Sequence, residues 1–160
     1  MNTTSFFKIL KHPVKFRMFL LSKLPLALFA GLRIREVSPQ RCVVSIPYKW
    51  MNKNPFRSTY FAALAMAAEM STGVLAMAAA SAGPVKVALL VVKLEATFFK
   101  KATGHTFFTC EDGDALRKTV QNAIDQNQPQ QFTATSTGVN EAGVPVATFH
   151  ITWSFKARTG

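Results

Sequence analysis

Hydrophobic residues recur along the chain with two different spacings, which separate helical from strand-like segments. In residues 144–157 apolar and polar side chains alternate, and the apolar positions are Phe149, Ile151, Trp153 and Phe155. Residues 112–127 instead place Leu116, Val120 and Ile124 four positions apart. The alternation predicts a strand with one buried face, and the fourfold spacing predicts an amphipathic helix.

Further strands are predicted on both sides of the chain's centre. Residues 32–37 and 41–47 form two short strand-like runs separated by Ser38-Pro39. Residues 85–100 are apolar on both alternating faces, which is typical of a central strand. Residues 105–110 return after a turn at 102–104, and residues 131–139 form a hairpin with 144–157.

A single long helix is predicted between these two groups of strands. Residues 58–82 are rich in Ala, Met and Leu, with Ser58 or Thr59 as the expected N-cap and Gly83-Pro84 as the stop. The only charged residue in this segment is Glu69. A helix that is apolar on all faces spans a membrane or occupies a core. Glu69 and the small side chains favour a core helix that a sheet can approach closely.

The first 31 residues predict helices that lie on a surface. Basic residues interrupt their apolar stretches, and only residues 24–32 lack charge, which is far short of the roughly 20 residues of a spanning helix. Charged and apolar residues are mixed, unlike the ordered regions of a signal peptide. We therefore expect amphipathic helices, broken at Pro13 and Pro25, that lie on the domain or on a membrane.

The order of the elements predicts an α+β protein with a hot-dog fold. In this fold an antiparallel sheet wraps around one long central helix, here preceded by extra N-terminal helices. We expect one domain over residues 1–160, with helices in 1–31 and the hot-dog core in 32–160. Because such a sheet leaves an outer edge unpaired, we expect a homodimer, with a tetramer as an open alternative.

The positive charge of the chain is concentrated in its first third. The net charge is +11, and residues 1–57 hold eleven Lys and Arg against one acid, a local charge of +10. Anionic lipid, a polyphosphate such as coenzyme A, or nucleic acid could balance this charge. Nucleic acid is not expected, because no basic run is interleaved with aromatic residues and no known module is present.

The residues that bind metals in other proteins are scattered here. Cys42 and Cys110 lie in separate strand-like runs, and His12, His105 and His150 are far apart. This spacing predicts no metal site and no cofactor. It indicates two buried, reduced thiols in a cytoplasmic protein.

The segment NPFRSTYFAALAMAAE, which ends at Glu69, resembles the corresponding segment of phenylacetate-type acyl-CoA thioesterases. Over nearly its whole length the chain is still more similar to an uncharacterised hot-dog family related to these enzymes. This similarity includes the basic N-terminal helices and the GLRI sequence that opens the first strand. The resemblance implies an acyl thioester substrate and a tunnel between two subunits.

The thioesterase motif has an Asn, then His-Gly-Gly at the start of the helix, and an acid nine residues after the His. The resemblance implies that Asn54 and Glu69 occupy the positions of the Asn and the acid. Tyr60, Phe61 and Ala62 stand where those enzymes have His-Gly-Gly. By this correspondence the N–H groups of Phe61 and Ala62 would hold the oxyanion, and Asn54 would orient substrate or water.

Glu69 carries the main chemical hypothesis, since a carboxylate in an apolar site can activate water or attack a thioester directly. The alternative is a structural acid paired with a hydroxyl or a basic residue. Thr72 lies one turn further on the same face and could bind Glu69 or a ligand. Lys53 and Arg57 could bind the phosphates of coenzyme A, or they could be ordinary solvated side chains.

The sequence therefore favours a cytoplasmic acyl-CoA thioesterase that acts at a dimer interface. The alternative is a non-catalytic acyl- or lipid-binding hot-dog protein, whose basic N-terminal helices contact an anionic membrane surface as a peripheral protein.

Overall fold

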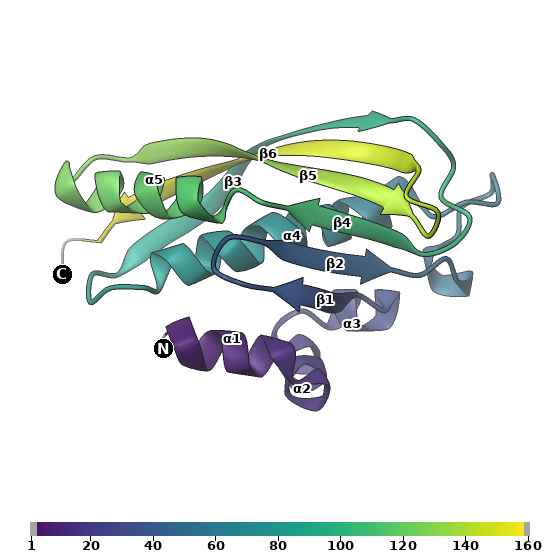
Figure 1. The fold of residues 1–160 in the computed structure, drawn as a ribbon, viewed down its shortest axis with the longest axis horizontal. Helices are drawn as coiled ribbons and strands as arrows, with labels where there is room; N and C mark the ends of the chain where they lie inside the picture. The colour runs from purple at the N-terminus through teal and green to yellow at the C-terminus, as the bar shows by residue number, and fades with distance from the viewer. Residues whose placement is uncertain (1–2, 159–160) are drawn as a thin grey trace.

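The structure is a computed structural model that describes residues 3–158, and its centre is one antiparallel sheet curved around one helix (Figure 1). The sheet has six strands in the order β1-β2-β4-β5-β6-β3. Its strands are β1 (Arg33–Val37), β2 (Cys42–Ile46), β3 (Val87–Phe98), β4 (Thr106–Cys110), β5 (Gln130–Asn140) and β6 (Pro145–Ala157). The long helix α4 (Phe61–Ala80) lies against the inner face of this sheet. The predicted hot-dog fold is confirmed.

The position of β3 in the sheet differs from the prediction. Its apolar residues on both faces indicated a central strand, but β3 pairs with β6 alone and forms one edge of the sheet. Most of its residues from Val92 onward are exposed. The apolar second face of β3 therefore has no cover within one chain, although its sequence is that of a strand covered on both sides.

The start of the long helix also differs from the prediction. Helix α4 begins at Phe61, with Tyr60 in the N-cap position and no side chain capping it. Ser58 does not cap the helix: its Oγ accepts from Asn54 Nδ2 over 3.1 Å, and its N–H donates to Asn54 Oδ1 over 3.2 Å. Thr59 N–H donates to Ala102 O, which ties this segment to the chain beyond β3. Hydrogen bonds to neighbouring segments therefore hold residues 58 and 59 outside the helix, as a bend at Ser58 and an isolated bridge between Thr59 and Lys53.

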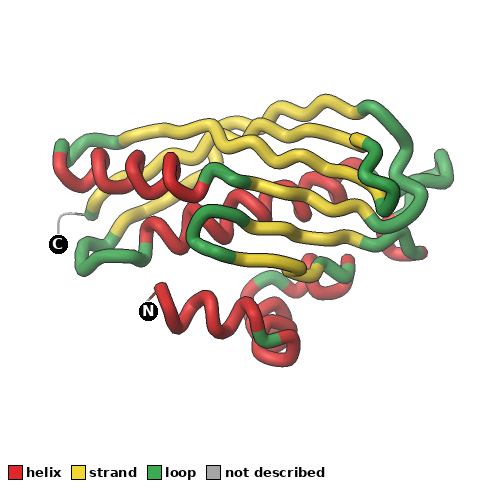
Figure 2. Tube along the Cα trace, in the orientation of Figure 1, coloured by secondary structure: helices red, strands yellow, loops and turns green. Residues whose placement is uncertain are grey.

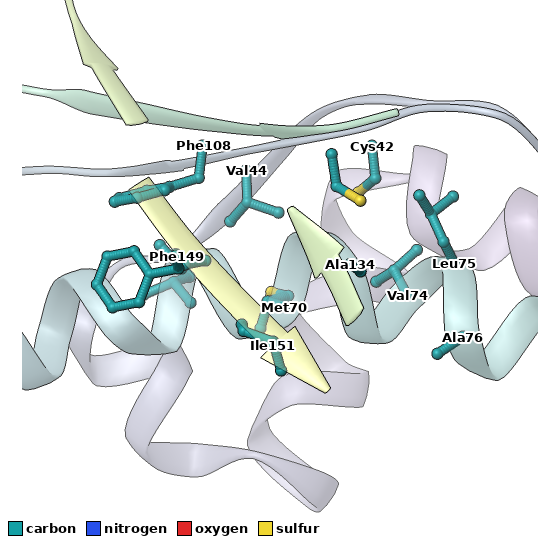
Figure 3. Packing of buried hydrophobic residues seen from close by; sticks show 14 of the residues in the cluster. Cys42, Val44, Met70, Val74, Leu75, Ala76, Phe108, Ala134, Phe149 and Ile151 are labelled. Carbon is teal, nitrogen blue, oxygen red and sulfur yellow. The ribbon is translucent and has the colours of Figure 1, made fainter. Parts of the chain in front are cut away.

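The core lies between α4 and the concave face of the sheet. Phe108, Phe149 and Ile151 are fully buried and project from β4 and β6 into the cluster that they share with Met70 of the helix (Figure 3). Fourteen of the twenty residues of α4 are buried. By length and hydropathy α4 could cross a membrane, but this burial identifies it as the core helix of the domain.

Three shorter helices precede the sheet, and one helix is inserted within it (Figure 2). They are α1 (Thr3–Lys11), α2 (Pro13–Lys23), α3 (Pro25–Ala30) and α5 (Gly113–Asp125), with a short 3-10 turn at Trp50–Asn52. Helix α1 contacts β1 and α4, and α5 packs on α4, β5 and β6. The N-terminal helices therefore lie beside the sheet edge formed by β1 and reach the middle of α4.

Helix α2 is not amphipathic in the ordinary sense. Phe16 and Leu20 are buried on one face, as an amphipathic helix requires. A second apolar row on the outer face, formed by Val14, Met18 and Leu21, is 59 to 66% exposed. The prediction of a simple amphipathic helix is wrong for α2, because this helix has apolar residues on both its inner and its outer side.

Candidate functional site

The start of α4 opens into a cavity of about 490 Å³, which we call the helix-start pocket. Phe61 and Leu64 line it from α4, Tyr60 lines it from the N-cap position, and Asn54 lines it from the preceding loop. Residues 98–102, at the end of β3, form its other wall. The pocket therefore lies where the helix start, the loop before it and the exposed sheet edge meet.

Two backbone N–H groups at the start of α4 have no partner among the described residues. Tyr60 N–H donates to Asn52 O over 2.6 Å, and Ala63 and Leu64 both donate to Tyr60 O. No hydrogen bond is formed within residues 3–158 by the N–H groups of Phe61 and Ala62. Unpaired N–H groups in a first helical turn carry partial positive charge, so they favour an anion.

The side chain of Asn54 organises the loop in front of the helix. Its Oδ1 accepts hydrogen bonds from the N–H groups of Phe56 and Ser58, at 3.0 and 3.2 Å. Its Nδ2 donates to Ser58 Oγ over 3.1 Å. Both ends of the amide are therefore engaged, and a direct contact with a substrate would require one of these bonds to be exchanged.

Four basic side chains surround this loop. Lys53 and Arg57 are exposed and line a depression beside Asn54, while Lys100 and Lys101 line the helix-start pocket from the opposite side. Lys101 Nζ donates to Phe56 O over 3.4 Å. None of the four lies in an ion pair among the described residues. The structure thus places positive charge without an ion pair in the helix-start pocket and in the depression that adjoins it at Asn54 and Pro55.

Glu69 lies in a second, separate cavity of about 230 Å³, which we call the Glu69 pocket. Its walls come from α4, from Leu89 of β3, from Trp153 of β6 and from the N-terminal helices. Glu69 is the only charged residue among the described residues that line it. The glutamate and the helix start are eight residues apart, about 12 Å along the helix axis.

The environment of Glu69 raises the pKa of its carboxyl above the ordinary value. The cause is desolvation, since apolar side chains replace part of the water around this half-buried group. No hydrogen bond or ion pair to the carboxylate is formed within residues 3–158, and Gly73 leaves the space beside it open. A Cβ added at Gly73 would lie 3.0 Å from Glu69 Oε1 and 3.2 Å from the Trp153 ring. An unpaired carboxylate of raised pKa is suited to accept a proton.

Thr72 lies behind this pocket and is completely buried. Its hydroxyl donates to the backbone oxygen of Glu69 over 3.0 Å and accepts the indole N–H of Trp153 over 3.0 Å. The hydroxyl therefore does not contact the Glu69 carboxylate. It fixes the orientation of Trp153 in the pocket wall.

The predicted site residues thus fall into two groups within one chain. Asn54, Tyr60 and Phe61 line the helix-start pocket, while Glu69 lies in its own pocket, with Thr72 behind it. Ala62 does not line either pocket. The sequence did not reveal the apolar residues of α1 and α2 that complete the Glu69 pocket. A helical apolar spacing in 1–31 was visible, but nothing in it indicated which partner those residues cover.

No group of three or more metal-ligating side chains is present in the described part of the chain. Cys42 and Cys110 are free and buried, directly opposite each other in β2 and β4. Burial raises the pKa of each thiol to about 12. The polar groups that line the two pockets include the Glu69 carboxylate, the Lys100 and Lys101 side chains and the start of α4.

The family model that matches this sequence is described as a domain of unknown function, DUF4442, and the match covers residues 14–155. No curated protein sequence matches the chain.

Several solved structures share its fold at low sequence identity. The Pseudomonas aeruginosa protein PA5026, described as a probable thioesterase, is 18% identical with a TM-score of 0.76, over 92% of this chain and 97% of that one. The Escherichia coli PaaI protein from the phenylacetic acid degradation operon is 15% identical with a TM-score of 0.61, over 89% and 91%. A hypothetical thioesterase from Streptococcus pneumoniae is 12% identical with a TM-score of 0.59, over 81% and 93%.

Proposed function

Because the chain belongs to the DUF4442 family and has the hot-dog fold of PaaI, we propose that it hydrolyses an acyl thioester. The observation that carries this proposal is Glu69, an unpaired carboxylate of raised pKa in an apolar pocket of the central helix. An unpaired charge in apolar surroundings lowers the stability of the folded state, so its presence indicates a functional role.

The proposed reaction uses Glu69 as the base and the start of α4 as the oxyanion site. The carboxylate takes a proton from water, and the resulting hydroxide oxygen bonds to the thioester carbon. The N–H groups of Phe61 and Ala62 stabilise the oxyanion that develops on the carbonyl oxygen. The C–S bond then breaks, and Glu69 gives the proton that it had accepted to the departing sulfur, so that a thiol leaves. In the alternative course Glu69 attacks the thioester carbon directly: the C–S bond breaks as an anhydride between Glu69 and the acyl group forms, and water then hydrolyses this anhydride and frees Glu69.

Two copies of the chain are needed for this reaction, since Glu69 and the helix start lie in separate pockets of one chain. Leu94 and Phe98 of β3 pair with Ile151 and Ala147, which are buried, and therefore face the same inner side of the sheet. Both are nevertheless exposed, at 46% and 48%. We infer a homodimer in which the β3 edges of two copies pair with each other. In this dimer the α4 helix of each copy covers Leu94 and Phe98 of the other copy.

Such a dimer would bring the separated groups together. A two-fold axis between paired β3 edges makes the two α4 helices antiparallel. The start of one helix then lies near the middle of the other, so Glu69 of one chain can face Phe61 of its partner. A tetramer of two such dimers is also compatible with the fold.

The basic residues at the pocket mouth suit a polyanionic leaving group. Lys100 and Lys101 line the helix-start pocket, and Lys53 and Arg57 line the adjoining depression. In the proposed complex these four cations bind phosphates of a coenzyme A thioester, because cations beside a helix start favour anions. We propose acyl-CoA as the substrate on this ground. The site as proposed needs no cofactor, and the protein is expected to act in the cytoplasm.

The test is release of free thiol from acyl-CoA thioesters of graded chain length. Glu69→Gln is expected to lower the rate by about 10²–10⁴-fold, the usual contribution of a general base. Asp125→Asn, which removes an exposed carboxylate at the end of α5, is the control and should retain the wild-type rate. No turnover at any chain length, or an unchanged rate in Glu69→Gln, would refute the proposal.

A second candidate function is non-catalytic binding of acyl chains or lipid at a membrane surface. The outer face of α2 and α3 favours it, because six large apolar side chains there are 46 to 68% exposed: Val14, Met18, Leu21, Leu24, Leu26 and Phe29. Lys11, Lys15, Arg17 and Lys23 are exposed around them. Apolar side chains bordered by cations are typical of helices that bind anionic bilayers as peripheral elements.

Co-sedimentation with vesicles that contain anionic lipid tests this second function. Leu21→Glu should bind markedly less than Ser22→Glu, since both add one negative charge to exposed positions of α2 but only the first removes an apolar side chain. Binding of the wild type should also fall as the salt concentration rises. Equal binding by the two variants would exclude this surface as the contact.

A further inference from the structure

The Glu69 pocket has the composition of a site for a hydrocarbon chain. Its walls include Phe6 and Leu10 of α1, Phe16 and Phe19 of α2, and Met77 and Trp153 of the core. All of these side chains are apolar or aromatic, and they come from both the N-terminal helices and the hot-dog core. Small-molecule sites are commonly apolar cavities with a few polar groups.

The mouth of the pocket can be located from exposure. Leu24 and Met77 line the pocket and are 46% and 37% exposed, whereas Phe6, Leu10 and Leu20 are at most 3% exposed. The pocket therefore opens beside Leu24 and Met77 and closes beneath α1. A chain entering there would extend under the N-terminal helices.

The single carboxylate in the wall selects the charge of the ligand. A second carboxylate close to Glu69 would be repelled, and it would also lose its hydration in apolar surroundings. An uncharged ester or thioester end avoids both penalties. The ligand chemistry that fits is therefore an unbranched acyl chain with a neutral carbonyl end.

The volume limits the length of that chain. A protein cavity of about 150 Å³ lined by Leu, Ile and Phe accommodates benzene, with its six carbons. The Glu69 pocket measures about 230 Å³. By proportion it holds a chain of roughly eight to ten carbons.

We propose that the Glu69 pocket binds the acyl chain of a medium-length ester or thioester, and that helices α1 and α2 form the wall that measures its length. The identification of this chain as the acyl group of the hydrolysed substrate rests on the proposed function. The binding of the chain itself does not, because a neutral acyl ester without coenzyme A carries the features that the pocket recognises.

The test uses the fluorescence of Trp153 in the full-length protein. The chain has two tryptophans, and Trp50 is 77% exposed, so Trp50→Phe leaves Trp153 as the only emitter. Methyl 8-bromooctanoate, whose bromine quenches nearby indoles, should quench Trp153 saturably. Ionised 8-bromooctanoate at pH 8 should bind about tenfold more weakly or worse. Absence of saturable quenching by the ester would overturn the proposal.

Two variants in the same background test the length limit, with a matched control. Phe19→Ala enlarges the pocket and should shift the preference from the 8-bromooctanoate ester to methyl 12-bromododecanoate by about tenfold. Met77→Trp adds an indole at the mouth, so its affinities are measured by displacement calorimetry and should decrease for both esters. Met18→Ala, in the adjacent position of α2 but 66% exposed, should change neither affinity. Circular dichroism verifies that each variant is folded.

The outcomes separate this proposal from the proposed hydrolysis. Saturable quenching without thiol release from any acyl-CoA would support acyl-chain binding in the Glu69 pocket and would refute the proposed hydrolysis. Thiol release without quenching, and with the same chain-length preference in Phe19→Ala and wild type, would support the proposed hydrolysis. It would refute acyl-chain binding in the Glu69 pocket.

Discussion

The indole N–H of Trp153 donates a hydrogen bond to Thr72 Oγ1 over 3.0 Å, which joins the last strand to the central helix inside the core. Both residues are buried, Trp153 at 4% exposure and Thr72 at 0%. The same hydroxyl donates to the backbone oxygen of Glu69. This bond therefore sets the position of the ring that forms one wall of the Glu69 pocket.

Thr72→Val is expected to destabilise the protein by about 1–3 kcal/mol, because it leaves the indole N–H buried without a partner. Urea unfolding measures this change. A cycle with Trp153→Phe separates the hydrogen bond from the loss of ring volume. If Thr72→Val cost the same in the Trp153→Phe background as in the wild type, the hydrogen bond would contribute nothing to stability.

Glu69 should make the stability of the protein decrease as the pH rises. Burial raises the pKa of its carboxyl above the ordinary value of 4.5, so the folded state binds this proton more tightly than the unfolded state does. Stability due to this group is present below pH 4.5 and is lost as the pH rises through the folded-state pKa. Glu69→Gln should therefore be more stable than wild type at pH 8, although it is expected to be inactive.

Thermal unfolding of both proteins between pH 4 and pH 9 measures this difference. The advantage of Glu69→Gln should increase with pH and then reach a plateau. A variant that is less stable than wild type at pH 8 would show that the carboxylate has a stabilising partner in solution.

Cys42 and Cys110 should be unreactive in the folded protein. Burial raises the pKa of each thiol to about 12, so almost no thiolate exists at pH 8, and reagents cannot reach either sulfur. An aromatic disulfide reagent should label no thiol in native protein and two thiols in denaturant. Rapid labelling under native conditions would indicate that β2 and β4 open locally.

Gly138 in β5 is required by the ring of Phe108. A Cβ added there would lie 2.7 Å from Phe108 Cζ, and the ring is fully buried. Gly138→Ala should therefore destabilise the protein by about 1–3 kcal/mol through overpacking. Gly83→Ala is the control, because nothing lies within 4 Å of its added Cβ and its effect on the unfolding midpoint should be small.

The proposed dimer depends on the inner face of β3. Leu94→Lys should shift the protein toward monomer in sedimentation velocity, because it places a charge where α4 of the second copy is expected. Leu90→Lys is the matched control: Leu90 is on the same strand and 65% exposed, but it pairs with Ser154 on the outer face. A wild-type monomer, or equal effects of the two lysines, would contradict this arrangement.

The sequence by itself determined the fold class and the identity of most elements. Local conformational preferences and the periodicity of apolar residues are enough to identify three features. These are the alternating strand β6, the apolar helix around Glu69, and the helix breaks at Pro13 and Pro25. These signals act over a few neighbouring residues, so they can be identified without knowing what each residue contacts.

The tertiary structure decided the features that depend on partners distant in the sequence. Ser58 has the chemistry of a helix cap, but its bonds with Asn54 place the helix start at Phe61. Strand β3 has a central strand's composition, but the sheet order places it at an edge.

The Glu69 pocket depends most strongly on tertiary structure. Phe6 and Phe19 meet Glu69 and Trp153 only because α1 and α2 pack across the middle of α4. The sequence identified Glu69 as an unusual charge in an apolar helix. Which side chains surround that charge, and therefore the direction of its pKa shift, is set largely by contacts between α4 and segments distant from it in the sequence, and no local pattern encodes these contacts.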